Sequence, residues 1–207
     1  MKVLANITSF LFHPLLMVTY GTLLALTYTY LAVYPPTVKL LITGGVLFST
    51  ALVPALFILL MIKNGAAVDI ELSDRKERAV PYLIFITSIL ACAFFLYKML
   101  MPFWLLNLLI GACTALVFAL IINFYWKISA HAIGIGGLLG GMMGVSHIQM
   151  INPYVSFIVV ILISGLLGTS RIILKKHTPM QVYAGFCLGF ICTFVTLLLS
   201  YIYSIVR

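Results

Sequence analysis

Long apolar runs separated by short polar breaks dominate this chain. They predict seven helical spans, at roughly 8–33, 38–62, 80–98, 102–124, 132–150, 153–170 and 179–205. Each run is close to the ~20 residues that a helix needs to cross about 30 Å of hydrocarbon. The two-residue alternation of a transmembrane β-barrel is absent from the sequence. We therefore predict an all-α fold, a polytopic transmembrane helical bundle of six to seven spans.

Three polar connections between the runs are longer than the others, at 63–78, 125–131 and 171–178. Two spans separate the first connection from the second, and two more separate the second from the third. An even number of crossings returns the chain to the same membrane face, so all three connections are expected at one face. This expectation depends on the tight break at 98–102, because one miscounted span would move the connections apart.

Most of the 12 lysine and arginine residues fall on that same face. By the positive-inside rule, we expect the face to be cytoplasmic in an integral protein of the cell inner membrane. The residues concerned are Lys2, Lys63, Arg75, Lys76, Arg78, Lys127, Arg171, Lys175 and Lys176, whereas Lys39, Lys98 and Arg207 fall on the other face.

Composition agrees with a membrane protein and excludes an ordinary soluble domain. Hydrophobic residues make up 64% of the chain and charged residues 8%, whereas about a quarter of the residues of soluble domains are charged. The net charge of +8 is typical of nucleic-acid-binding proteins, but too few basic residues lie outside the apolar runs to follow a phosphate backbone. We expect membrane lipids with anionic headgroups as partners, and no nucleic acid.

Glycine fills much of the fifth span. Gly136 and Gly140 are four residues apart, as are Gly137 and Gly141. This spacing lets helices approach closely in a bilayer. A phosphate-binding loop would also use glycine, but these glycines continue into an apolar helix, so helix packing is the expected role.

The first polar connection holds all the acidic residues of the chain. If it is helical, Glu71 pairs with Arg75 and Asp74 with Arg78 at four-residue spacing, each pair contributing about 0.2–0.5 kcal/mol. A salt-bridged interfacial helix is therefore one interpretation, and this segment by itself favours it. The alternative is that Arg75, Lys76 and Arg78 supply positive charge to a bound phosphate.

The third connection favours phosphate chemistry more strongly. Arg171 ends an apolar run, and its planar guanidinium suits two phosphate oxygens. His177 reaches the same place if the chain turns back between them, and an imidazole is a suitable nucleophile for phosphorus at neutral pH. Lys175 and Lys176 fit the simpler role of interfacial cations that extend toward water.

Two short motifs contain these candidates. Ser170-Arg171 is followed after five residues by His177 and after three more by Gln181. Ser129-Ala130-His131 lies about forty residues earlier. Together they resemble the type 2 phosphatidic acid phosphatase superfamily, which includes bacterial lipid phosphatases and vanadium haloperoxidases. The resemblance covers roughly 75–189, so we expect one integral-membrane domain over 1–207 with two N-terminal spans in 1–62 and a phosphatase-like core in 63–207.

The resemblance implies a chemical role for each matched residue. His177 would attack the phosphate to form a phosphohistidine, and His131 would protonate the departing alcohol. The phosphoryl oxygens would be held by Arg171, Ser170, Ser129 and part of the Arg75, Lys76 and Arg78 cluster. The resemblance implies no metal and no other cofactor.

The sequence departs from the family pattern at three places. The family's third motif ends in an aspartate that orients the nucleophile, and Gln181 stands there. Glutamine can accept a hydrogen bond from His177, but it cannot stabilise an imidazolium by charge. Arg78 is not followed directly by proline as in the first motif, and Ile128 and Ala130 replace the proline and glycine of the second.

The sequence thus predicts a membrane phosphatase that hydrolyses a lipid phosphate or an isoprenyl diphosphate through a phosphohistidine. A catalytically weak or inactive relative that binds or transports anionic lipids is the alternative, and an unrelated small transporter is less favoured because no inverted repeat is evident. We expect His147 at the opposite face and His13 in a packed or interfacial role.

Overall fold

Helix is the dominant structure in the described part of the chain. The computed structural model describes residues 1–67, 69 and 75–206, without the side chains of 75–76 and 203–206. The α-helices are α1 (Lys2–Leu11), α2 (Met17–Tyr28), α3 (Pro36–Leu47), α4 (Val53–Lys63), α5 (Ala79–Lys98), α6 (Phe103–Tyr125), α7 (Ala130–Gln149), α8 (Tyr154–Ile173) and α9 (Pro179–Val206). Short helical turns occur at η1 (Pro14–Leu16), η2 (Tyr30–Val33), η3 (Phe48–Leu52) and η4 (Arg75–Arg78).

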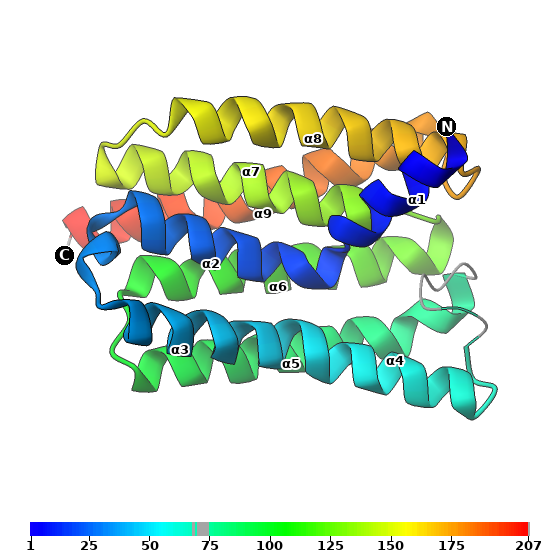
Figure 1. Cartoon of the computed structure of the whole chain (residues 1–207), viewed down its shortest axis with the longest axis horizontal. Coiled ribbons are helices and arrows are strands. Elements are labelled where there is room, and N and C mark those ends of the chain that lie inside the picture. Colours follow the sequence, from blue (N-terminus) through cyan, green and yellow to red (C-terminus); the bar gives the residue numbers. More distant parts are fainter. Residues whose placement is uncertain (68, 70–74, 207) are drawn as a thin grey trace.

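The helices form one elongated bundle, as predicted (Figure 1). Within the described residues, six helical segments are long and apolar enough to cross a membrane, and two of the six each combine a pair of helices, α1 with α2 and α3 with α4. The protein is therefore an integral membrane protein with an all-α, polytopic fold. Helix α7 runs alongside these segments over the length of the bundle (Figure 1) but is not among the six.

Helix α7 occupies the interior of the bundle, which explains its lower hydropathy. It contacts α2, α6, α8 and α9, and more than half of its residues are buried. A helix that is covered by other helices does not need the apolar surface that lipid requires. Glycine and histidine are therefore tolerated in a segment that still runs through the bundle.

The described parts of the three long connections lie at the same end of the bundle, as the count of crossings predicted. Figure 1 shows the end of α4, the start of α5, the α6–α7 turn and the α8–α9 turn together at the end where the N-terminus lies. The C-terminal end of α9 and the α7–α8 turn lie at the opposite end. We call the end where the N-terminus, the α6–α7 turn and the α8–α9 turn lie the cationic end.

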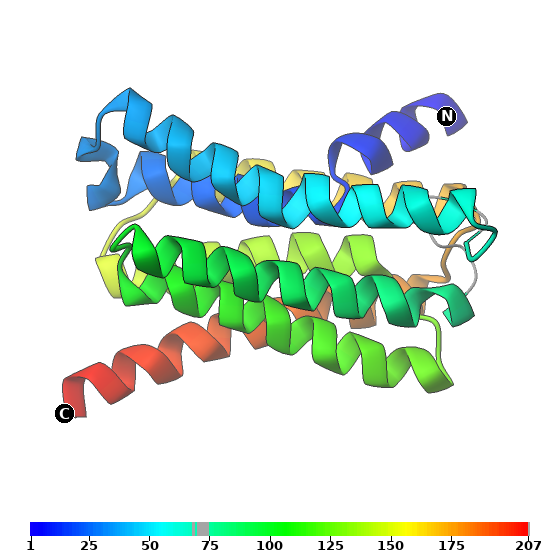
Figure 2. The same cartoon turned by 90° about the horizontal axis from the view of Figure 1, so that it is seen from below.

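The first predicted span is broken rather than continuous. Helix α1 ends at Leu11, and η1 begins at Pro14, whose ring fixes the backbone and lacks an N–H for helical bonding. The His13 side chain caps η1 by accepting the N–H of Leu15. Helix α1 packs on α8 and diverges from the bundle axis (Figure 2). The break places His13 inside the protein at the cationic end.

Helices α7 and α9 pack at backbone contact, which confirms the packing role of the glycines. A Cβ atom at Gly136 would overlap the carbonyl oxygen of Phe186, and one at Gly189 would overlap the carbonyl oxygen of Ile133. The Thr193 hydroxyl joins the two helices by donating to the Gly137 carbonyl oxygen at 3.0 Å. Small residues allow this approach, and the close packing stabilises the pair in the bilayer.

We predict that Gly189→Ala destabilises the protein by about 1–3 kcal/mol, because the added methyl group would force α7 and α9 apart. The control is Gly165→Ala on α8, where a Cβ would meet no heavy atom within 4 Å. Thermal unfolding of both variants in detergent measures the effect. Equal midpoints would contradict the α7–α9 contact as described.

Candidate functional site

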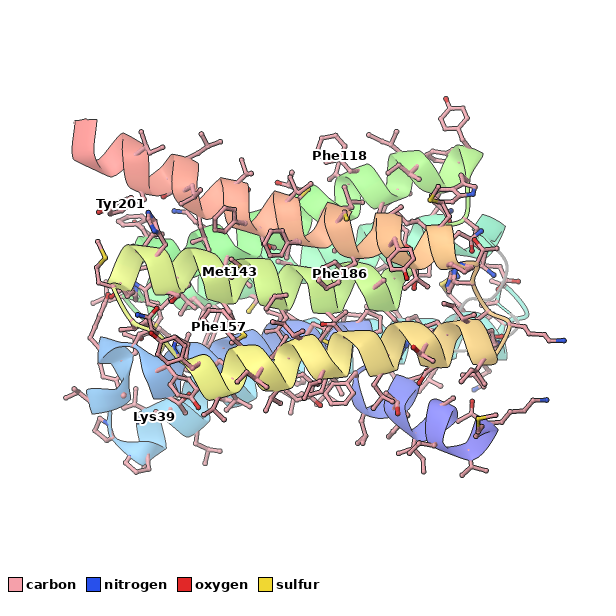
Figure 3. All side chains as sticks on the ribbon, turned by 90° about the horizontal axis from the view of Figure 1, so that it is seen from above. Lys39, Phe118, Met143, Phe157, Phe186 and Tyr201 are labelled. Carbon is pink, nitrogen blue, oxygen red and sulfur yellow. The ribbon has the colours of Figure 1, made fainter. Side chains whose placement is uncertain are left out.

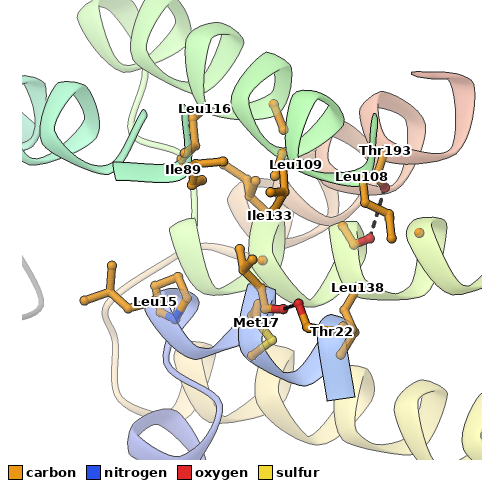
Figure 4. A pocket seen from close by; sticks show the side chains of 18 of the residues that line it. Leu15, Met17, Thr22, Ile89, Leu108, Leu109, Leu116, Ile133, Leu138 and Thr193 are labelled. Carbon is orange, nitrogen blue, oxygen red and sulfur yellow. Dashed lines mark hydrogen bonds between the residues drawn. The ribbon is translucent and has the colours of Figure 1, made fainter. Parts of the chain in front are cut away.

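A cavity begins at the cationic end and continues into the bundle between α2, α5, α6 and α7 (Figure 4). Its lining at this end includes His13, Arg78, His131, Arg171 and His177. These residues come from five separate parts of the chain: the α1–α2 break, η4, α7, α8 and the α8–α9 turn. The fold therefore brings together two histidines and two arginines that the sequence proposed, and it adds a third histidine.

The turn after α8 places His177 beside Arg171. Both the Lys176 and the His177 backbone N–H groups donate to the carbonyl oxygen of Arg171, at 3.1 and 3.4 Å. Lys175 adopts a left-handed conformation, with φ of 56°, which reverses the chain direction after α8. Arg171 is 2% exposed and His177 is 7% exposed. The sequence analysis required the chain to turn back between Arg171 and His177. The hydrogen-bonded C-terminal end of α8 makes this turn.

Gln181 holds His177 by a direct hydrogen bond. Gln181 Oε1 lies 3.0 Å from His177 Nδ1 and also accepts the backbone N–H of Thr178 at 3.2 Å. The Thr178 N–H can only donate, so the shared atom is the amide oxygen, and His177 Nδ1 must carry the proton. The lone pair of the neutral imidazole is therefore on Nε2.

Burial keeps His177 in this neutral form. Desolvation lowers the pKa of His177 to about 3, and the nearby charges of Arg78, Arg171 and Lys127 act in the same direction. The hydrogen bond to Gln181 opposes the shift without reversing it. At neutral pH the imidazole therefore has an unprotonated nitrogen, which a nucleophile needs.

His131 is held in the first turn of α7. The Ser129 hydroxyl caps this helix by accepting the N–H of Ala132 at 3.3 Å. His131 Nε2 lies 3.2 Å from the carbonyl oxygen of Ser9 on α1. Because a carbonyl oxygen only accepts, Nε2 of His131 carries a proton, and Nδ1 is the nitrogen that can take up another.

Arg78 is a structural part of the site as well as a source of charge. It is 4% exposed, and its Nη1 donates to the carbonyl oxygen of Ile128 at 2.8 Å, which joins the start of α5 to the α6–α7 turn. Arg75 and Lys76 belong to η4, and their side chains lie outside what the structure describes. The expected pairs of Glu71 with Arg75 and of Asp74 with Arg78 also involve residues outside the described part.

Positive charge is concentrated at this end of the bundle. Burial and the charges of Arg78, Lys176 and Arg171 lower the pKa of Lys127, and Asp69 raises it. Asp69 also forms an ion pair with Lys176 at 3.7 Å between partly exposed side chains, which is weak stabilisation. These surroundings favour the binding of an anion.

Two of the proposed phosphate ligands lie behind the cavity wall. The Ser129 hydroxyl caps α7, and the Ser170 hydroxyl donates to the carbonyl oxygen of Leu166 at 2.8 Å. Neither serine is part of the cavity lining, although both are buried. Their observed contacts are with the backbone of their own helices. Gln181 likewise contacts His177 rather than the cavity.

His13 is the site residue that sequence reasoning missed. Its ring packs edge-on against the ring of His131, with 5.3 Å between centroids. The expected packed role is correct, but its partner is a candidate catalytic histidine. The available signal was a histidine next to Pro14 inside an apolar run, where a helix break turns side chains inward. Tyr82, one turn after Arg78, also lines the cavity.

His147 lies at the other end of the bundle, as its distance along α7 predicted. Its ring is 6.4 Å from that of Tyr201 on α9, and Figure 3 shows Tyr201 far from the α8–α9 turn. The described histidines thus divide into three at the cationic end and one at the opposite end.

The lining of the cavity at the cationic end suits an anionic group. Two buried guanidinium groups and a neutral imidazole with a lone pair on Nε2 line one cavity, and guanidinium groups bind phosphate oxygens well. Among the described residues, no group of three or more histidine, cysteine or acidic side chains could hold a metal ion.

Comparison of the chain with protein-family models, curated proteins and solved structures finds no match.

Proposed function

We propose that the protein is a membrane phosphatase that hydrolyses a lipid phosphate or an isoprenyl diphosphate through a phosphohistidine. One observation carries the proposal: a neutral His177, held through Nδ1 by Gln181, shares a buried cavity with Arg78 and Arg171. The same cavity continues into the apolar interior of a membrane protein, where a lipid chain can lie. The motif spacing of the lipid phosphatases agrees with these roles.

In the first step, His177 Nε2 attacks the phosphorus atom. A P–N bond forms, and the bond between phosphorus and the lipid oxygen, or the bridging oxygen of a diphosphate, breaks. The departing oxygen takes a proton from Nδ1 of His131, which has received that proton from the singly protonated phosphate group of the substrate and returns to its neutral form. The Nε2–H bond of His131 to the Ser9 carbonyl oxygen holds the ring while Nδ1 exchanges the proton.

In the second step, water hydrolyses the phosphohistidine. His131 accepts a proton from the attacking water, the P–N bond breaks, and phosphate leaves with His177 neutral again. Arg78 and Arg171 stabilise the negative charge on the phosphoryl oxygens in both steps. Because both guanidinium groups are buried, their charges are screened less by water and act more strongly on the phosphate.

The cationic end is proposed to face the cytoplasm in the cell inner membrane. Lys63 and the turn of Lys175 lie at this end, and Lys39 and Lys98 lie at the other (Figure 1). The difference agrees with the positive-inside rule.

A binding or transport protein for anionic lipids is the second candidate. Gln181 favours it, because an uncharged amide orients His177 but does not stabilise an imidazolium. The loss of an orienting carboxylate costs about 10⁴-fold in turnover in a serine protease, which gives the scale of the possible effect. Measured turnover separates the two candidates.

We predict that His177→Ala lowers phosphate release by at least about 10³-fold, since it removes the nucleophile. Purified protein in detergent is assayed against lipid phosphates and isoprenyl diphosphates. The matched control is His147→Ala, which changes a histidine at the opposite end and is expected to retain activity. Equal release by wild type and His177→Ala would exclude the nucleophile assignment.

We predict that Gln181→Asp increases turnover and moves the acid limb of the kcat/KM profile to higher pH. A carboxylate bonded to Nδ1 stabilises the imidazolium, so it raises the pKa of His177 from about 3. The nucleophile then loses activity by protonation at a higher pH than in wild type. Gln149→Asp, at the far end of α7, is the control. An unmoved acid limb with unchanged or lower turnover would contradict the assigned pairing of Gln181 with His177.

A further inference from the structure

The hydroxyl group of Tyr82 is buried beside the cavity without a hydrogen bond. The side chain of Tyr82, on α5, is 6% exposed and lines the cavity. Its hydroxyl oxygen has no hydrogen-bond partner among the described residues. A buried tyrosine hydroxyl normally has a partner, because its removal from water is otherwise costly. The described part of the fold therefore does not account for a hydroxyl at this position.

Tyr82 differs from the other buried hydroxyls that lack a partner within the described residues. These belong to Ser9 and Thr19, which do not line the cavity. A serine or threonine in a helix can turn its hydroxyl toward a carbonyl oxygen of the preceding turn. A tyrosine hydroxyl cannot do so, because the ring holds it away from the backbone of its own helix. Its partner has to come from another part of the protein or from a ligand.

Arg78 supports a ligand as the partner. It precedes Tyr82 by four residues at the start of α5, and residues at this spacing lie on one face of a helix. Both side chains line the cavity, and the charge of Arg78 acts on the Tyr82 hydroxyl. The hydroxyl nevertheless forms no hydrogen bond with the guanidinium group. An acceptor that binds beside Arg78 would lie within reach of both donors.

The charges around the cavity select the kind of acceptor. Arg78 and Arg171 are buried, and among the described residues that line the cavity none is acidic. Their charges therefore favour an anion. Two guanidinium groups and a hydroxyl can all donate hydrogen bonds, so the anion needs oxygens that point in several directions. The tetrahedral oxygens of a phosphate group meet this condition better than the two coplanar oxygens of a carboxylate.

We infer that the Tyr82 hydroxyl donates a hydrogen bond to an oxygen of a phosphate group bound beside Arg78. Tyr82 is then a third donor of the anion site, with Arg78 and Arg171, and it lies outside the motifs that the sequence matched. Its hydroxyl lacks a bond in the ligand-free protein and gains a charge-assisted one when phosphate binds. This inference rests on the proposed function for its choice of phosphate and adds a binding residue to the same site.

The first test is thermal unfolding of Tyr82→Phe in detergent without ligand. Phenylalanine keeps the ring and removes the hydroxyl that lacks a bond, so we expect a Tm equal to or above that of wild type. The control is Tyr97→Phe at the other end of α5, where the side chain is 53% exposed and the Tm is expected not to change. A Tm of Tyr82→Phe below that of both other proteins would show that the hydroxyl is bonded within the fold, and it would overturn the inference.

Phosphate binding is expected to weaken in the same variant. Isothermal titration calorimetry measures the Kd of inorganic phosphate and of octylphosphonate, a lipid-like probe whose C–P bond is not hydrolysed. We expect Tyr82→Phe to raise the Kd by at least about tenfold, as for the loss of one hydrogen bond to a charged group, and Tyr97→Phe to match wild type. Weaker binding of both probes supports recognition of the phosphate group by itself, and weaker binding of octylphosphonate alone supports a lipid headgroup. An unchanged Kd in Tyr82→Phe, or no binding of either probe to wild type, overturns the inference.

Hydrolysis of farnesyl phosphate separates this inference from the proposed function. We expect kcat/KM to fall by about tenfold in Tyr82→Phe and to stay unchanged in Tyr97→Phe. If Tyr82→Phe weakens binding and wild type hydrolyses no phosphate ester, the proposed function fails and the role of Tyr82 stands. If wild type hydrolyses the ester and Tyr82→Phe changes neither the Kd nor kcat/KM, the role of Tyr82 fails and the proposed function stands.

Discussion

The close contact between α7 and α9 is the constraint on which the site depends. A Cβ at Gly185 would lie 2.8 Å from the Ser129 carbonyl oxygen, and one at Gly189 would overlap the carbonyl oxygen of Ile133. The backbone N–H of Ser129 donates to the carbonyl oxygen of Gln181 at 3.4 Å, next to the starts of both helices. His131 follows the start of α7, and His177 precedes the start of α9. Packing of two glycine-rich surfaces therefore brings the two histidines together.

Burial of charge is the second constraint. It destabilises the bundle, whereas the α7–α9 contact stabilises it. Arg78 and Arg171 are nearly inaccessible at the cationic end, where ionisable groups are costly unless they interact with polar partners or ligands. Arg78 bonds to the Ile128 carbonyl oxygen, and a bound phosphate would add compensating negative charge. The same burial keeps His177 neutral. Desolvation thus favours both a neutral His177 and the binding of an anion beside the two arginines.

The N-terminal segment contributes more than an additional membrane span. The break at Pro14 turns His13 toward His131, and the Ser9 carbonyl oxygen fixes the protonated nitrogen of His131. Helix α2 then forms one wall of the cavity (Figure 4). The proposed headgroup site lies mainly on residues after 63, whereas the cavity as a whole is also lined by residues of the first two membrane segments.

The sequence by itself determined the helical membrane fold, the common face of three polar connections and the close packing of the glycine-rich helix. These features depend on periodicity, segment length and spacing along the chain, which act through neighbouring residues. The hydrogen bond of Gln181 to His177, four residues away, follows the sequence expectation. The tertiary structure alone decided that the Ser129 and Ser170 hydroxyls lie behind the cavity wall and that His13 joins the site. The position and shape of the cavity were also decided by the tertiary structure alone. They depend on where helices that are distant in sequence leave space between their side chains.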